Sequence, residues 1–197
     1  MNLPNKLTIL RIILVPVFTA LFFITALPYN YVLSAVVFAI AALTDFLDGY
    51  IARKYNIVTN LGKFLDPIAD KALVATALIV LITSNGVCFG LGVDLTIAFT
   101  CLVALIIIRE LGISGFRMIA AKRQLVLAAD KIGKAKTFVT DFAILFLIVA
   151  LDFSGKVFSV LMWIGYILFA IGAILTVVSG VNYIVKNKEV LKDSENA

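Results

Sequence analysis

The sequence predicts an all-α, polytopic membrane protein with six transmembrane helices. Of its 197 residues, 62% are hydrophobic, and the mean hydropathy is +1.10, whereas a soluble globular domain is nearer to half apolar. Several apolar stretches approach or exceed the roughly 18 to 20 residues that a helix needs to cross a bilayer. Most basic residues stand between these stretches or after them. We therefore expect one membrane domain built from helices.

Each predicted helix is an apolar stretch bounded by a turn or a polar segment. Pro28 separates the first from the second, and the polar segment Lys54 to Lys63 separates the second from the third. Asn85-Gly86 and the segment Asp152 to Lys156 mark two more turns. The predicted spans are 6–26, 31–54, 64–84, 95–121, 132–151 and 156–185. They form one catalytic domain over residues 1–185, and residues 186–197 form a polar C-terminal tail.

The distribution of basic residues predicts the orientation in the membrane. Lysines and arginines gather at the N-terminus, around the connections after the second and fourth helices, and after the sixth. The alternate connections, near 27–30, 85–94 and 152–156, hold one lysine in total. The positive-inside rule then places both termini and the two basic connections in the cytoplasm. With no signal-peptide or transit-peptide pattern, we expect a multi-pass protein of a bacterial cytoplasmic (inner) membrane.

Two scarce residue types limit the possible chemistry. The chain has no histidine, which excludes a Ser-His-Asp or Cys-His catalyst and a histidine-ligated metal. A general base must therefore be a carboxylate, a lysine, a tyrosine or water. Cys88 and Cys101 match no metal-ligand spacing, and we expect both to be free thiols.

Four aspartates lie between two strongly apolar stretches. Asp45 and Asp48 are three residues apart at the end of the second helix, so they share a helix face. Asp66 and Asp70 are four apart at the start of the third, where Pro67 suits the first helical turn. Since a short connection makes the two helices neighbours, the four carboxylates can converge at one depth near the cytoplasmic interface.

The free-energy cost of placing these acids in a membrane helix limits the roles that they can have. An ionised aspartate costs about 2.5 to 3.5 kcal/mol at the centre of a membrane helix. Two divalent cations would balance four negative charges, and oxygen ligands suit magnesium. Two metals about 3.5 to 4 Å apart can clamp a phosphoryl group during in-line displacement. The residues also allow an ion or proton relay, or a salt-bridge network with Arg53, Lys63 and Lys71.

The aspartate segment resembles the signature of the CDP-alcohol phosphotransferase family. It reads Asp45-x2-Asp48-Gly49-x2-Ala52-Arg53-x8-Gly62-x3-Asp66-x3-Asp70, without departure from the pattern. The resemblance implies a six-helix fold, usually a homodimer, that binds a CDP-linked lipid and two divalent cations, Mg²⁺ or Mn²⁺. It assigns the four aspartates to the metals, and Asp70 also to the role of general base on the attacking alcohol. Gly49, Arg53 and Gly62 are expected around the nucleotide and the diphosphate.

The flanking segments are similar to one branch of that family, the bacterial phosphatidylglycerophosphate synthases. They are "NLPNKLTILR" (2–11), "IIIRELGISGFR" (106–117) and "KIGKAKT" (131–137). This implies transfer of the phosphatidyl group of CDP-diacylglycerol to the sn-1 hydroxyl of glycerol 3-phosphate, with release of CMP. We expect the lipid bilayer and a second copy of the chain as partners, and no nucleic acid.

Other functions stay open from the sequence. The same chemistry on phosphatidylglycerol, inositol phosphate or serine is the nearest alternative. An ion-coupled transporter, with the aspartates as a relay, is a distant one.

A dianionic acceptor needs a cationic pocket. Arg109 follows a long apolar run, Arg117 lies eight residues on and so within about 80° on a helix, and Lys134 opens the next predicted helix. We expect these three residues to bind the acceptor phosphate and Glu110 to neutralise an arginine. Lys136 is interpreted instead as a topology signal in contact with anionic lipid.

The N-terminal segment offers two polar candidates for the nucleotide. Asn5 and Thr8 are expected to help bind the CDP-lipid. The same Asn5-x2-Thr8 spacing, after Pro4, also suits a helix cap.

Overall fold

The computed structural model describes residues 3–55, 60–90, 92–122 and 131–187. These ranges contain helices and turns but no strand. The helices are α1 (Leu3–Phe23), α2 (Asn30–Tyr55), α3 (Asn60–Ile82), α4 (Asn85–Phe89), α5 (Thr96–Lys122), α6 (Lys131–Ala150) and α7 (Gly155–Lys186). The all-α prediction is therefore confirmed, and the six long helices follow the predicted spans closely.

Two local predictions are wrong. The third helix begins at Asn60 rather than at 64, so Pro67 lies in its third turn and not its first. The Asn85-Gly86 turn is instead the start of the short helix α4, where the amides of Val87 and Cys88 both donate to the carbonyl of Ser84. α4 has only five residues, and two of them are buried. It therefore packs against one end of the core rather than forming an exposed turn.

Polar side chains shape the connections between the long helices. Asn30, at the start of α2, donates to the carbonyl of Phe22 at 2.9 Å, which links the end of α1 to the start of α2. At the start of α5, the amide of Thr96 donates to Asp94 Oδ1 at 2.9 Å. This hydrogen bond lowers the pKa of the exposed Asp94 carboxyl, because it stabilises the charged form.

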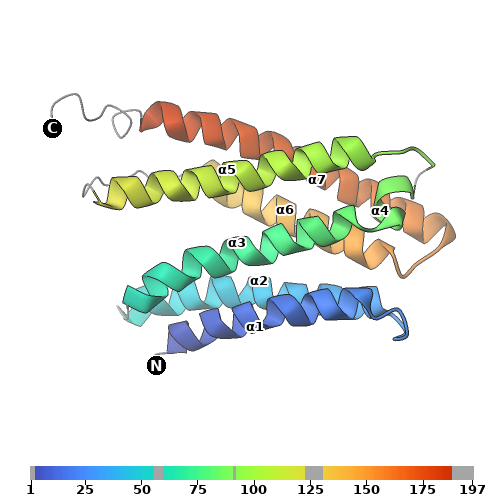
Figure 1. The fold of residues 1–197 in the computed structure, drawn as a ribbon, viewed down its shortest axis with the longest axis horizontal. Coiled ribbons are helices and arrows are strands. Elements are labelled where there is room, and N and C mark those ends of the chain that lie inside the picture. Colours follow the sequence, from blue (N-terminus) through green and yellow to red (C-terminus); the bar gives the residue numbers. More distant parts are fainter. Residues whose placement is uncertain (1–2, 56–59, 91, 123–130, 188–197) are drawn as a thin grey trace.

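The long helices form an elongated bundle (Figure 1). α1 packs on α2 and α3, α6 packs along α7, and α3 also contacts α5 and α6. One end of the bundle carries the start of α1, the end of α2, the start of α3, the end of α5, the start of α6 and the end of α7. We call this the site end. It brings together the segments on which the predicted functional residues lie.

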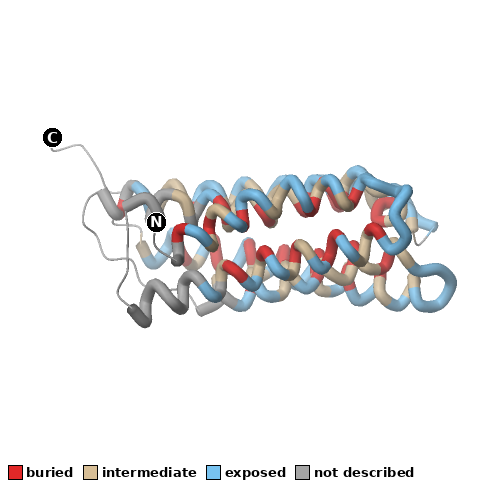
Figure 2. The backbone as a smooth tube through the Cα atoms, turned by 90° about the horizontal axis from the view of Figure 1, so that it is seen from below, coloured by how far each residue is buried: buried red, intermediate tan, exposed pale blue. Residues whose placement is uncertain are grey.

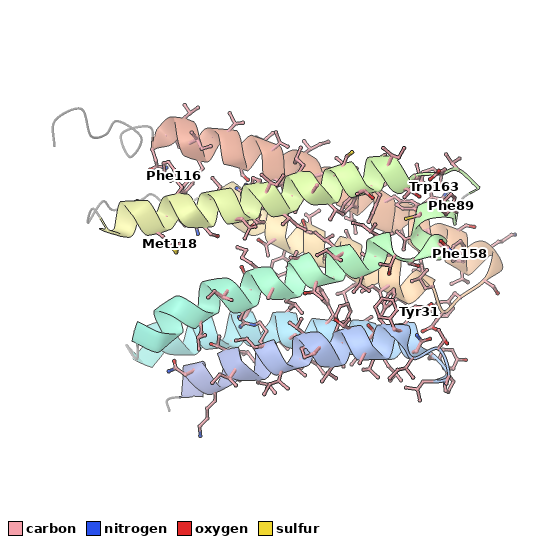
Figure 3. The ribbon with its side chains drawn as sticks, in the orientation of Figure 1. Tyr31, Phe89, Phe116, Met118, Phe158 and Trp163 are labelled. Carbon is pink, nitrogen blue, oxygen red and sulfur yellow. The ribbon has the colours of Figure 1, made fainter. Side chains whose placement is uncertain are left out.

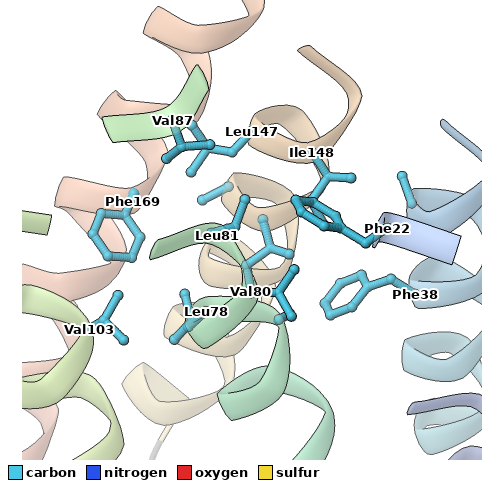
Figure 4. Close-up of a cluster of buried hydrophobic side chains, with 14 of the residues drawn as sticks. Phe22, Phe38, Leu78, Val80, Leu81, Val87, Val103, Leu147, Ile148 and Phe169 are labelled. Atoms are coloured by element: carbon cyan, nitrogen blue, oxygen red, sulfur yellow. The ribbon is translucent and has the colours of Figure 1, made fainter. Parts of the chain in front are cut away.

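Buried positions lie mainly where helices face one another (Figure 2). The centre of the core holds Phe22, Phe38, Leu81, Leu147 and Phe169, from five of the long helices and all nearly inaccessible (Figure 4). Glycines allow α6 and α7 to approach closely, since a Cβ at Gly165 would lie 2.7 Å from Leu147 Cδ2. Small residues play this part in membrane helix packing, where lipid tails are as apolar as leucine and close contact drives association.

The outer surface is apolar, as expected for a membrane protein. Ile97 is 78% exposed, and Ile108 and Met118 are each 70% exposed. Within the described residues, three helical segments are long and apolar enough to cross a bilayer: Asn5–Phe23, Thr96–Met118 and Gly155–Lys186. The crossing of all six long helices stays a prediction. Both cysteines are free thiols, as predicted.

Candidate active site

A cavity of about 470 Å³ lies between α3, α5 and α6, in the half of the bundle nearer the site end. Its wall is mostly apolar, with Leu78, Ile106 and Leu111 among the lining residues. Five ionisable side chains interrupt this wall: Asp70, Lys71, Glu110, Lys136 and Asp141. An apolar cavity with a few convergent charged groups is the usual form of a small-molecule site.

Glu110 connects the charged groups of three helix segments. Its carboxylate accepts from Arg109 Nη1 at 2.9 Å, from Lys71 Nζ at 3.0 Å, and from Lys136 Nζ in a short contact. Lys71 Nζ also lies 2.6 Å from Asp70 Oδ2. Since these side chains are at most 30% exposed, solvent screens the network only partly. The predicted pairing of Glu110 with an arginine is confirmed, and two lysines share the same carboxylate.

The first and last of the four predicted aspartates are described by the structure. Asp45 pairs with Arg11 Nη1 at 2.9 Å, and the Arg11 side chain is fully buried while that of Asp45 is 47% exposed. Asp70 lines the cavity. Asp141 lines the same cavity, which brings two acids to one region.

The side chains of several predicted site residues lie outside those described. They are Asp48, Gly49, Arg53, Gly62, Asp66 and Lys134. Their backbones belong to α2, α3 and α6, at the site end. Convergence of the four carboxylates therefore stays a prediction, and the described side chains alone contain no group of three or more potential metal ligands. A carboxylate donor set suits Mg²⁺ or Mn²⁺; of the four aspartates, Asp45 is 47% exposed and Asp70 lines the cavity.

Asn5 and Thr8 lie inside α1, which already begins at Leu3, so the helix-cap interpretation is wrong. Both side chains are buried, although both are polar. Their burial near the site end is unusual for polar residues of an apolar helix. Their predicted role beside the nucleotide stays a prediction.

The two predicted arginines face α7. Arg109 Nη2 donates to Ser179 Oγ at 2.6 Å. Arg117 Nε donates to Tyr183 Oη at 3.3 Å, and its guanidinium lies 5.2 Å from the centre of the Tyr183 ring. Neither arginine lines the cavity, which is lined instead by Lys71 and Lys136. Their role at the acceptor phosphate stays a prediction.

Sequence reasoning missed or misread three cavity residues. Lys136 is buried and bound to Glu110, so its interpretation as a lipid-facing topology signal is wrong. The sequence indicates Lys71 only as a countercharge, and no motif in it marks Asp141. The available signal was a charge inside a predicted span, because an ionisable residue at that depth is costly and commonly functional.

Comparison with known proteins identifies the family. Residues 1–178 match the family model described as CDP-alcohol phosphatidyltransferase. A protein of Rickettsia bellii is 41% identical over 182 residues, which are 92% of this chain and 93% of the relative. A Bacillus subtilis protein is 38% identical over 98% of both chains, and a Salmonella typhimurium protein is 35% identical over 93% of both.

All three relatives are named CDP-diacylglycerol–glycerol-3-phosphate 3-phosphatidyltransferase. The family match covers the aspartate segment and every residue that lines the cavity. The chain belongs to the CDP-alcohol phosphatidyltransferase family.

Proposed function

We propose that this chain is a CDP-diacylglycerol–glycerol-3-phosphate 3-phosphatidyltransferase, a phosphatidylglycerophosphate synthase of anionic phospholipid biosynthesis. The observation that carries this proposal is the shared name of relatives that are 38–41% identical over more than nine-tenths of the chain. The unbroken aspartate signature and a charged cavity beside Asp70 support it.

The metal site of the proposed enzyme consists of Asp45, Asp48, Asp66 and Asp70, which would hold two Mg²⁺ or Mn²⁺ ions. When bound, these ions neutralise the diphosphate and the charge that develops on the transferring phosphoryl group. Gly49, Arg53 and Gly62, with Asn5 and Thr8, would surround the nucleotide.

Asp70 is the proposed general base. Its carboxylate lines the cavity, and Lys71 holds one of its oxygens at 2.6 Å. That ion pair holds the carboxylate in one orientation. Asp70 takes the proton of the sn-1 hydroxyl while that oxygen bonds to the phosphorus that carries diacylglycerol. The bond from this phosphorus to the CMP oxygen breaks, and CMP leaves with the electron pair.

Cations for the acceptor phosphate stand close to this base. Lys71 and Lys136 line the same cavity, and Arg109 joins them through Glu110. A lysine ammonium attracts a phosphate dianion more strongly in a low-dielectric cavity than in water. The proposed acceptor set remains Arg109, Arg117 and Lys134, and the cavity adds Lys71 and Lys136 to it.

The lipid donor would enter sideways from the inner leaflet. Ile68, Leu111 and Met118 line the cavity and are also 47%, 58% and 70% exposed, so an apolar surface runs from the cavity to the outside. Met118 lies at the site end of α5 (Figure 3). Diacyl chains can follow this surface while the diphosphate stays at the polar end.

The proposed setting is a bacterial cytoplasmic membrane, with six spans, both termini and the active site on the cytoplasmic side, and a homodimeric assembly. The aromatic residues Tyr31, Phe89 and Trp163 lie at the opposite end of the bundle (Figure 3). Tyrosine and tryptophan are enriched where a membrane protein meets the headgroups.

Release of CMP tests the proposed function. Purified protein in detergent would be given CDP-diacylglycerol and Mg²⁺ with glycerol 3-phosphate, inositol 1-phosphate, phosphatidylglycerol, serine or no acceptor. We expect release only with glycerol 3-phosphate and its loss on addition of EDTA. Release with another acceptor would keep the chemistry and change the acceptor, whereas no release from folded protein would favour the transporter alternative.

A further inference from the structure

We propose that Asp141 accepts a hydrogen bond from the C2 hydroxyl of the acceptor and thereby selects glycerol 3-phosphate over alcohols that lack this group. This inference rests on the proposed function, since it concerns the acceptor of that reaction. Asp141 belongs to α6, outside the aspartate signature, and it lines the cavity together with Asp70.

The carboxylate of Asp141 is incompletely satisfied by the protein. Its Oδ1 is buried, and among the side chains and amides that the structure describes none donates a hydrogen bond to it. A buried polar atom without a partner is costly, so such atoms are rare in native proteins and call for an explanation. A hydrogen-bond donor supplied by a ligand is one such explanation.

The neighbouring cations do not fill this role. The ammonium groups of Lys71 and Lys136 act on Asp141 electrostatically, but both point to Glu110, at 3.0 Å and in a short contact. Asp70 and Asp45 oppose the charge of Asp141. Asp141 Oδ1 therefore lies in a region that has positive charge nearby, yet no described group donates to it.

The chemistry of the acceptor shows which of its groups fits. A phosphate dianion only accepts hydrogen bonds, so it belongs beside Lys71 and Lys136 rather than beside Asp141. The sn-1 hydroxyl gives its proton to Asp70 in the proposed reaction. The C2 hydroxyl is then the donor of glycerol 3-phosphate that remains without a partner, and Asp141 Oδ1 is a buried oxygen to which no described group donates.

The test compares two acceptors that differ only in this hydroxyl. 3-Hydroxypropyl phosphate keeps the attacking hydroxyl and the phosphate but has no C2 hydroxyl. A site built to bind a hydroxyl rejects an analogue without it, because the acid is left unpaired. We expect wild-type kcat/KM to favour glycerol 3-phosphate by about 10-fold to 100-fold, the usual effect of a hydrogen bond to a charged group.

Asp141→Leu and Asp141→Asn are the diagnostic variants. In Asp141→Leu the preference should fall to within about 2-fold, through loss of rate with glycerol 3-phosphate and little change with the analogue. The KM for CDP-diacylglycerol and the Mg²⁺ concentration for half-maximal rate should stay unchanged. Asp94→Asn, which changes an exposed acid outside the cavity, is the matched control and should keep the wild-type preference.

Stability gives a second readout that a structural acid would not produce. Without acceptor, Asp141→Leu should unfold at a higher temperature than wild type, because it removes a buried oxygen atom to which no described group donates a hydrogen bond. If Asp141→Leu does not fold, Asp141→Asn keeps the shape and still weakens the hydrogen bond, so a reduced preference is expected there too.

Three results would overturn the inference while leaving the proposed function intact. The first is an unchanged acceptor preference in both variants. The second is an equal loss of rate with both acceptors, which would make Asp141 a base. The third is a raised Mg²⁺ requirement, which would make it a metal ligand. Absence of glycerol 3-phosphate-dependent CMP release from the wild type would instead overturn the proposed function, and the inference with it.

Discussion

At the scale of single residues, Asp70 combines the strongest sequence signal with a defined contact. It closes the aspartate signature, lines the cavity, and has one oxygen 2.6 Å from Lys71 Nζ. Asp70→Asn keeps the shape and removes the base, so kcat should fall by about 10²-fold to 10⁴-fold. A quenched time course of CMP release would measure kcat, and equilibrium binding of CDP-diacylglycerol would measure the affinity of the donor site. Near-wild-type turnover in this variant would show that another group takes the proton.

Glu110 is the residue on which the charge network depends. Glu110→Gln leaves Lys71, Lys136 and Arg109 without their common carboxylate. Removing one partner of a buried ion pair costs about 3 to 5 kcal/mol, and partial exposure of these side chains places the expected loss at or below the lower figure. Thermal unfolding in detergent should show a lower midpoint.

A double-mutant cycle separates this pairing from general damage. Glu110→Gln and Lys136→Met should each destabilise the protein, and the double variant should lose less than the sum of the two. Additive losses would mean that the Glu110–Lys136 contact contributes nothing specific.

The cations of the site differ in what they contact, and this difference is testable. Lys136 lines the cavity, whereas Arg117 contacts Tyr183 of α7. Lys136→Ala should raise the KM for glycerol 3-phosphate far more than the KM for CDP-diacylglycerol, because a dianion loses a countercharge. Arg117→Ala should raise it less. If Arg117→Ala raises the KM for glycerol 3-phosphate more than Lys136→Ala does, at equal stability, then the acceptor phosphate binds beside Arg117 rather than in the cavity.

At the scale of helices, the contact between α6 and α7 depends on small residues. A Cβ at Gly165 would lie 2.7 Å from Leu147 Cδ2 and 3.2 Å from the Leu147 backbone nitrogen. A Cβ at Gly112 would meet no described atom within 4 Å beyond its chain neighbours and the nearby backbone of its own helix. Gly165→Ala should destabilise by about 1 to 3 kcal/mol through overpacking. Gly112→Ala should be neutral or stabilise by up to about 1 kcal/mol, since alanine favours a helix. Unfolding of the two variants side by side measures the difference, and equal midpoints would contradict close packing at Gly165.

The helices show which features the sequence could predict. Long apolar runs predicted the six long helices because membrane thickness sets their length, and their bounds follow the predictions closely. α4 could not be predicted, since five residues carry no periodic pattern and its burial depends on the core around Val87. The start of α3 differs from the prediction because Asn60, Gly62 and Lys63 are typical of a connection rather than of a membrane helix.

The site shows a sharper limit. The sequence can propose the aspartate site because a fixed spacing along two neighbouring helices defines it, and the convergence of its four carboxylates stays a prediction. The partners of Glu110 were not, because they come from α3 and α6 and depend on how those helices pack against α5. For the same reason, helix position alone could not show that Arg109 and Arg117 turn toward α7 rather than into the cavity.

At the scale of the whole molecule, the arrangement makes a prediction about topology. The end of α7 lies at the site end, and the connection between α6 and α7 lies at the opposite end (Figure 1). Exposed positions mark both: Lys186 ends α7, and Ser154 precedes it. The positive-inside rule predicts that the basic, site end faces the cytoplasm. The proposed function requires the same orientation, since the CDP-lipid headgroup and glycerol 3-phosphate must reach the cavity from one side.

Single-cysteine labelling in intact cells checks this orientation. In a chain with Cys88→Ala and Cys101→Ala, a membrane-impermeant maleimide should label Ser154→Cys from outside and should leave Lys186→Cys unlabelled until the membrane is opened. Both variants should keep CMP release, since neither position lines the cavity. Labelling of Lys186→Cys from outside would show the opposite orientation, in which the aspartates lie away from the cytoplasmic substrates. Labelling of both sites from outside would give α7 no crossing, against its 32-residue apolar length.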